Sequence, residues 1–143
     1  MSYNPFTRQS DVTNTGRFNA NQSGSSIPKG TPVKITSSGL GLVDVSLEAD
    51  IDAFAGILKD VASNGTNGIV VSSGSIENIN TPFPVGSMVY ISKLGILTNV
   101  KPSTGVNGFG EGDFIVKIGM IAQNVDSVGA KDLLVGIQIM GQL

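Results

Sequence analysis

Residues 27–39, IPKGTPVKITSSG, and residues 83–95, FPVGSMVYISKLG, share one pattern. Both follow the order apolar-Pro-x-Gly-x-x-Val-x-Ile-[Ser/Thr]-x-x-Gly, and the register holds without a gap. After the first glycine, apolar and polar residues alternate, and turn-forming residues end the run. This is typical of a β-strand followed by a tight turn. The two stretches therefore predict a repeated strand-and-turn unit.

The likeness between the two halves of the chain continues downstream. AGIL at residues 55–58 matches IGMI at 118–121, and IVV at 69–71 matches LLV at 133–135. Each half follows the order strand, turn, strand, long connection, strand, strand. Because neither half-sheet would bury its apolar face alone, we expect the two to close on one another.

The predicted fold class is all-β, a small barrel or sandwich built from two repeated half-sheet units. The β-barrel domain covers residues 27–143, with pseudo-repeats at about 27–82 and 83–143. Short apolar runs between turn formers predict its strands at residues 33–36, 41–45, 54–59, 68–72, 88–92, 96–100, 114–118, 120–124 and 133–140. One short helix is expected over residues 46–53, with Ser46 as its N-terminal cap.

Two Pro-x-Gly turns are expected to act as scaffold elements of the repeat. Pro28 and Pro84 fix the path of the chain just before a strand, where a missing N–H removes no ladder hydrogen bond. Gly30 and Gly86 allow a turn or bulge conformation that other residues disfavour.

Residues 1–26 are predicted to form an extended N-terminal arm that precedes the barrel. They are rich in Asn, Ser, Thr and Gln and lack the apolar period of a strand or a helix. Isolated larger side chains along the arm are typical of a segment that orders on a partner, and the predicted partner-binding residues are Tyr3, Phe6, Arg8 and Phe18. The alternative interpretation is a frayed terminus.

Composition excludes several classes of function. The 143 residues contain no Cys, His or Trp, which excludes a disulfide, a zinc or haem site, a thiol nucleophile and a Ser/His couple. Nine bases and eleven acids give a net charge of −2, so no basic field is available for nucleic acid. We therefore expect no enzyme, no cofactor, no metal site and no nucleic-acid partner.

The same composition bears on membranes and on self-association. No run of 18 residues lacks a polar break, so no membrane-spanning helix is expected, and the absence of an apolar signal core at the start predicts synthesis in the cytoplasm. Charged residues make up 14%, against about 25% in an ordinary soluble chain, while 40% are hydrophobic. Such a chain leaves apolar surface that small domains usually hide against copies of themselves or a partner.

Two groups of carboxylates are candidate sites. Glu111 and Asp113 could form an acid/base pair, but a glycine-flanked hairpin loop lacks the apolar cleft that raises a catalytic pKa. The densest set of oxygen ligands does not have the spacing of a calcium-binding loop, and a solvated loop or helix start is the favoured interpretation for Asp44, Glu48, Asp50 and Asp52.

The second repeat resembles a known family. The stretch PFPVGSMVYISKLGILT at residues 82–98, followed by Lys101-Pro102-Ser103 and by VKIGMIA at 116–122, is similar to a module of tailed-bacteriophage virion proteins. These are the small β-barrels of capsid decoration, cement and head-fibre-base proteins, with related modules in tail fibres and baseplates. The likeness covers about residues 27–143.

The resemblance implies a structural function and carries over no catalytic residue. It implies a homotrimer that sits on the outside of a capsid, contacts the major capsid protein or another virion protein, and stabilises the shell. The protein would then be located in the virion after synthesis in the host cytoplasm, and its arm would grip the capsid lattice or another fibre component.

The alternative is a tail-fibre or baseplate module that recognises a host-surface carbohydrate or another fibre protein. A sugar site needs exposed aromatic platforms beside polar side chains, and only Tyr90, Phe109 and Asn107 are candidates for it.

Overall fold

The predicted all-β class is confirmed. A computed structural model of the chain describes residues 14–20 and 24–143, and within them it contains nine strands and one short helix. In chain order the elements are β1 (Asn14–Ala20), β2 (Pro32–Thr36), β3 (Gly39–Leu42), α1 (Glu48–Asp52), β4 (Phe54–Leu58), β5 (Asn67–Ile76), β6 (Met88–Ile91), β7 (Leu97–Thr98), β8 (Phe114–Gln123) and β9 (Lys131–Gln142).

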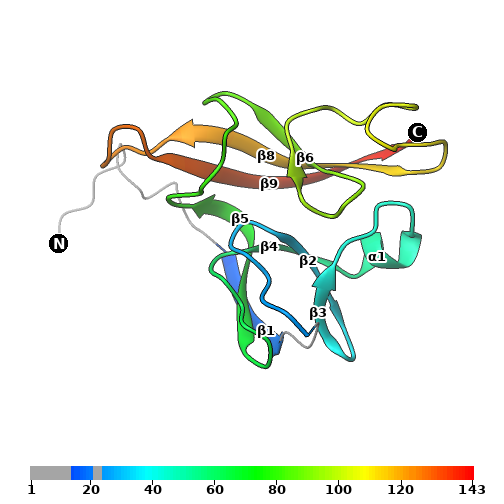
Figure 1. Cartoon of the computed structure of the whole chain (residues 1–143), viewed down its shortest axis with the longest axis horizontal. Helices are drawn as coiled ribbons and strands as arrows, with labels where there is room; N and C mark the ends of the chain where they lie inside the picture. The colour runs from blue at the N-terminus through cyan, green and yellow to red at the C-terminus, as the bar shows by residue number, and fades with distance from the viewer. Residues whose placement is uncertain (1–13, 21–23) are drawn as a thin grey trace.

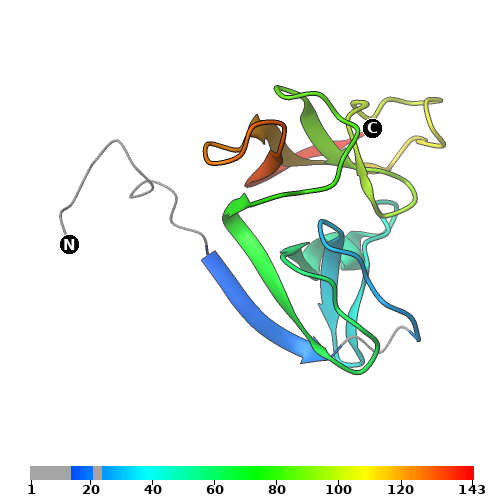
Figure 2. The same cartoon turned by 60° about the vertical axis from the view of Figure 1, so that its left-hand side comes forward.

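The strands form one curled antiparallel sheet in the shape of a half-barrel. Its order is β3-β2-β4-β5-β9-β8-β6-β7, and β1 pairs with β5 beside this path. Figure 1 shows β6, β8 and β9 in one layer above the layer of β2, β3 and β4. Turned by 60°, the view in Figure 2 shows β5 running from the lower layer up to the second. The curl lets two half-sheets face one another.

The two halves have the same pairing at equivalent positions. In the first half Val33 lies opposite Gly56, and the register shifts by a bulge directly after Val33. In the second half Val89 lies opposite Gly119, and the register shifts directly after Val89. The two valines occupy the same position of the repeated pattern. The sequence repeat is therefore also a repeat of strand register.

The Pro-x-Gly turns make matching hydrogen bonds. The amide of Gly30 donates to the carbonyl oxygen of Leu58 at 2.9 Å, and the amide of Gly86 donates to that of Ile121 at 2.8 Å. Both glycines have positive φ, +86° and +93°, which side-chain-bearing residues rarely adopt. Each turn thus links the start of its hairpin by a hydrogen bond to the neighbouring strand of the sheet, β4 in the first half and β8 in the second.

One part of the sequence alignment is shifted by one residue. Pairing places Leu58 opposite Val70 and Ile121 opposite Leu133, so Val70 is the counterpart of Leu133. The apolar pattern of the sequence instead aligns Ile69 with Leu133. Three consecutive apolar residues look alike in either register, and only the neighbouring strand distinguishes them.

Several predicted boundaries differ from those observed. The strands expected at 114–118 and 120–124 are one continuous strand, β8, because Gly119 adopts an extended conformation within it. The strand expected at 96–100 shortens to the two residues of β7, and the one expected at 41–45 is β3, which ends at Leu42.

The helix is also shorter than predicted, and Ser46 does not cap it. Leu47 occupies the N-cap position without a side-chain hydrogen bond. The Ser46 hydroxyl instead donates to the Asp44 carboxylate at 2.6 Å, as does the Ser46 amide at 2.9 Å. A local Asp turn therefore competes successfully for the serine.

Part of the predicted arm joins the sheet. Within residues 1–26, Asn14–Ala20 forms β1, which pairs antiparallel with β5 from Asn14 opposite Ser73 to Ala20 opposite Asn67. A polar segment without apolar period gains order here because the edge of β5 offers unpaired backbone groups. Residues 1–13 and 21–23 lie outside the described part of the chain.

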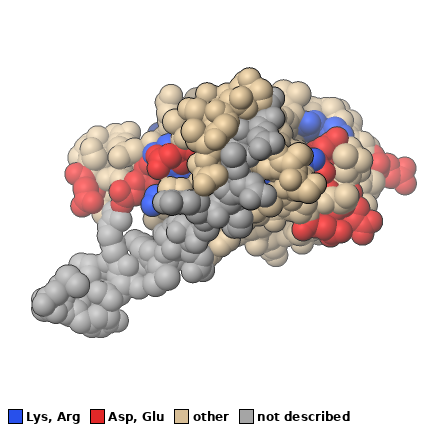
Figure 3. Space-filling model, turned by 90° about the horizontal axis from the view of Figure 1, so that it is seen from below, with Lys and Arg blue, Asp and Glu red and all other residues tan. Residues whose placement is uncertain are grey.

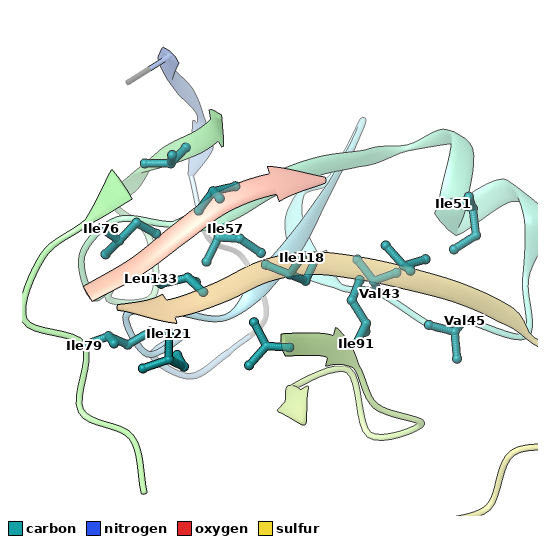
Figure 4. Close-up of a cluster of buried hydrophobic side chains, with 14 of the residues drawn as sticks. Val43, Val45, Ile51, Ile57, Ile76, Ile79, Ile91, Ile118, Ile121 and Leu133 are labelled. Carbon is teal, nitrogen blue, oxygen red and sulfur yellow. The ribbon is translucent and has the colours of Figure 1, made fainter. Parts of the chain in front are cut away.

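The larger of two buried clusters joins both halves. In Figure 4, Ile57 of β4 and Ile76 of β5 lie with Ile118 of β8 and Leu133 of β9 in one group. All four are at most 1% exposed. A smaller cluster lies within the first half and consists of Ile27, Val33, Leu40, Leu58, Ala62 and Val70. Since the main core takes side chains from both halves, either half alone would expose its apolar face to solvent.

Gly119 is predicted to be indispensable for this packing. A Cβ at this position would overlap the carbonyl oxygen of Leu134, so Gly119→Ala forces β8 and β9 apart. We expect a loss of about 3 kcal/mol in the free energy of unfolding, or failure to fold. Urea denaturation followed by circular dichroism measures it.

Gly136→Ala is the matched control, because Gly136 lies on β9 with open space where its Cβ would be. Its effect should stay below about 1 kcal/mol. Equal stability of the two variants would contradict the packing argument.

Candidate interaction surface

The described structure places only some of the predicted site residues. Tyr3, Phe6 and Arg8 lie outside the described residues, so their partner-binding role stays a prediction. Phe18 lies in β1, opposite Gly68 of β5. The four turn residues are in place at the starts of the two hairpins.

A network of five charged side chains lies where the two halves meet. Lys34 of β2 pairs with the Asp50 carboxylate at 2.7 Å, and Lys93, after β6, pairs with Asp113, before β8, at 2.9 Å. Asp50 and Asp113 are only 7% and 5% exposed. Asp44 joins them, because its amide donates to Asp50 at 2.9 Å. Some of the few charged side chains of this protein thus form ion pairs with one another.

Two of these carboxylates are held in the ionised form. The amide of Gly110 donates to Asp113 at 2.8 Å, and this hydrogen bond, helped by Lys93, lowers the pKa of Asp113 against the opposing effect of burial. The hydroxyl and amide of Ser46 lower the pKa of Asp44 in the same way, with smaller contributions from Lys93 and Lys34.

This geometry argues against acid/base chemistry at Glu111 and Asp113. A general acid needs a raised pKa, whereas the pKa of Asp113 is lowered and its carboxylate is paired with Lys93. Glu111 is exposed on the adjacent loop. Among the described residues, no group of three or more acidic side chains is arranged to hold a metal ion.

The candidate sugar platforms are buried, which overturns that part of the alternative. Tyr90 is 7% exposed and Phe109 4%, so neither ring presents a face to a ligand. Phe54, Phe83 and Phe114 pack against the main core. Asn107 is exposed at the tip of a loop, with φ of +51°.

The outer face of the second half carries an apolar row. Met88 of β6 lies opposite Met120 of β8, which lies opposite Leu134 of β9. Val89 and Leu133, the chain neighbours of Met88 and Leu134, are fully buried, so the row points to the other face of the sheet. Met88 is 42% exposed and Leu134 36%. The sequence placed these residues in strands, but periodicity alone did not single them out.

The surface around the fold is poor in charge. In the face shown in Figure 3, acidic and basic side chains gather mainly toward the two ends, and most of the described surface is uncharged. A shallow open depression of about 330 Å³ also lies beside the connection between the halves. Its wall is largely apolar and includes Pro28, Ile79, Phe83, Ile96 and Leu97. Exposed apolar side chains are thus distributed over several parts of the surface rather than gathered in one cleft.

Comparison of the chain with known proteins finds no relative. No protein-family model, curated protein or solved structure matches the chain. In the described part of the chain no helix has the length and apolarity needed to cross a membrane.

The Lys93–Asp113 pair predicts a pH dependence of stability. Because the folded pKa of Asp113 lies below its unfolded value of about 3.8, the pair stabilises the fold above that pH and loses its effect as pH falls through the lowered pKa. Asp113→Asn should therefore lower the free energy of unfolding by about 1 kcal/mol at pH 7. Urea denaturation from pH 7 to about pH 2 should show the gap closing at the acid end.

Glu111→Gln removes an exposed carboxyl two residues away and is the control for the lost charge. It should change stability by less than about 0.5 kcal/mol at pH 7. A gap between wild type and Asp113→Asn that stays constant down to the lowest pH would contradict the role of this pair.

Proposed function

We propose that this protein is an auxiliary structural protein of a tailed-bacteriophage virion. It binds the outside of the capsid as a homotrimer, stabilises the shell and performs no catalysis. It is made in the host cytoplasm and ends in the virion. The support is the resemblance of the second repeat to virion β-barrels, whose hairpin pattern falls on β6 and β7 and whose later strand falls on β8.

The observation that carries the proposal is the apolar row of Met88, Met120 and Leu134. Met88 and Leu134 are exposed and Met120 between them is half-buried, and such apolar side chains on a charge-poor sheet are typical of the centre of a protein interface. The outer face of a curled sheet suits a protein surface better than a small molecule, which needs a concave site. Three rows on one trimer would bind a lattice with avidity that a single copy lacks.

The homotrimer is directly testable. At micromolar concentration, equilibrium ultracentrifugation should give about three times the chain mass of 14.7 kDa. Apolar surface buried between copies provides the driving force. A clean monomer would contradict the proposal.

Lysine substitutions in the apolar row test the capsid contact. Met120→Lys combined with Leu134→Lys should weaken binding at least tenfold, because two lysines would lose hydration in the interface. Binding is measured by co-sedimentation with capsids of the encoding phage assembled without this protein, and electron microscopy of intact particles separates a head position from a tail position.

Val125→Lys combined with Val128→Lys is the matched control, since both valines are highly exposed on the turn between β8 and β9. It should bind as wild type does. Equal binding by the row variant and the control would remove the row from the capsid contact, and no binding by wild type would refute the proposed function.

A further inference from the structure

The two halves of the sheet are related by an approximate twofold. Counterparts in the central strands, such as Val70 and Leu133, are 63 positions apart in the sequence. Ser73 of β5 lies opposite Gly136 of β9, and these residues are also 63 positions apart. A residue that pairs with its own counterpart lies on the twofold, so the axis passes between β5 and β9 at this pair.

The symmetry is satisfied on one side of the axis only. There, residues 74–76 of β5 pair with residues 133–135 of β9. The symmetric continuation would pair residues 137–139 of β9 with residues 70–72 of β5. In its place β1 lies on β5, with Thr15 opposite Val71 and Gly16 opposite Val70. From Ile137 onward, β9 pairs only with β8 among the described strands.

The open edge of β9, residues 137–142, carries neither a charge nor a proline. Natural edge strands carry charges, prolines or bulges that prevent pairing with another chain. In residues 137–142 the protection is limited to irregular pairing: the register against β8 shifts near Ile137 and at Met140, where β9 has an extra residue. Ile139 is 50% exposed and Met140 43%. A long, neutral edge with exposed apolar side chains is suited to receive one more strand.

We infer that a second copy of the chain fills this edge with residues 2–12 of its N-terminal arm. The 13 residues before β1 reach about 43 Å when extended, and the six-residue edge spans about 20 Å. The apolar anchors Tyr3 and Phe6 provide partners for Ile139 and Met140. Each copy donates its arm to the next, which closes a ring of identical contacts. The inference rests on the homotrimer of the proposed function but not on capsid binding.

Strand directions favour exchange between copies over pairing within one copy. β1 and β9 are both antiparallel to β5, so they run the same way, and Asn14 and Gly136 both lie opposite Ser73. Followed back toward its first residue, Asn14, β1 therefore points away from residues 137–142. A copy's own arm would have to reverse its direction to reach its own edge, whereas an arm from a neighbour carries no such constraint.

Cysteine cross-linking tests the contact, because the chain contains no native cysteine. Gln138→Cys is combined in turn with Thr7→Cys, Gln9→Cys and Asp11→Cys, since adjacent strands bring Cα atoms within disulfide range at some register. After oxidation of the full-length protein, at least one pair should give covalent dimers and trimers on a non-reducing gel. The same arm cysteines combined with Val125→Cys, on the exposed turn after β8, are the control and should stay monomeric. A disulfide within one copy, or no cross-link above the control at any position, would overturn the inference.

A second measurement does not depend on register. Ile139→Lys combined with Met140→Lys places charges on the open edge and should lower the mass in equilibrium ultracentrifugation about threefold, from trimer to monomer. Far-ultraviolet circular dichroism should remain unchanged. Val125→Lys combined with Val128→Lys should remain a trimer. If the edge variant also remains a trimer, the arm exchange is wrong while the homotrimer stands; if trimers cross-link but never bind capsids, the proposed function fails and the exchange stands.

Discussion

The close approach of backbones at Gly56 and Gly119 is the constraint on which the rest of the structure depends. Each glycine lies in the middle of a strand held between two neighbours, and at each a Cβ would overlap a carbonyl oxygen, that of Val71 or of Leu134. The bulges after Val33 and Val89 lie opposite these glycines. Both halves therefore bend at the same place, and the bend turns one sheet into two facing layers.

Facing layers determine where the apolar side chains and the charges go. The main core takes residues from both halves, which makes the pair of repeats one cooperative unit. One lysine–aspartate pair joins β2 to α1, and the other joins the loop after β6 to the loop before β8; both carboxylates are buried and hydrogen-bonded. Breaking such a pair is costlier than its net contribution suggests, because a buried charge would be left alone. The low charge of the chain therefore coexists with a specific internal network and an apolar outer face.

Much of the fold follows from local signals. The Pro-x-Gly turns, the alternation in β2 and β6 and the repeat itself predicted the two hairpins, because a turn and a two-residue period are properties of neighbouring residues. The one-residue shift at Val70 and Leu133 did not follow, since uniform apolar runs fix no register by themselves. The predicted N-cap role of Ser46 was wrong because its hydroxyl binds the Asp44 carboxylate instead. That turn depends on Asp50, whose carboxylate accepts a hydrogen bond from the Asp44 amide.

The sequence by itself determined the all-β class, the repeat, the scaffold turns and the low content of charged residues, since each depends only on residue types and their spacing. Only the tertiary structure decided which apolar side chains remain outside. Met88, Met120 and Leu134 form a row because register brings three strands together, and Tyr90 and Phe109 are buried although their local sequence allows exposure. It also decided that β1 covers β5 while the end of β9 stays open, because strand pairing depends on long-range geometry that no local pattern encodes.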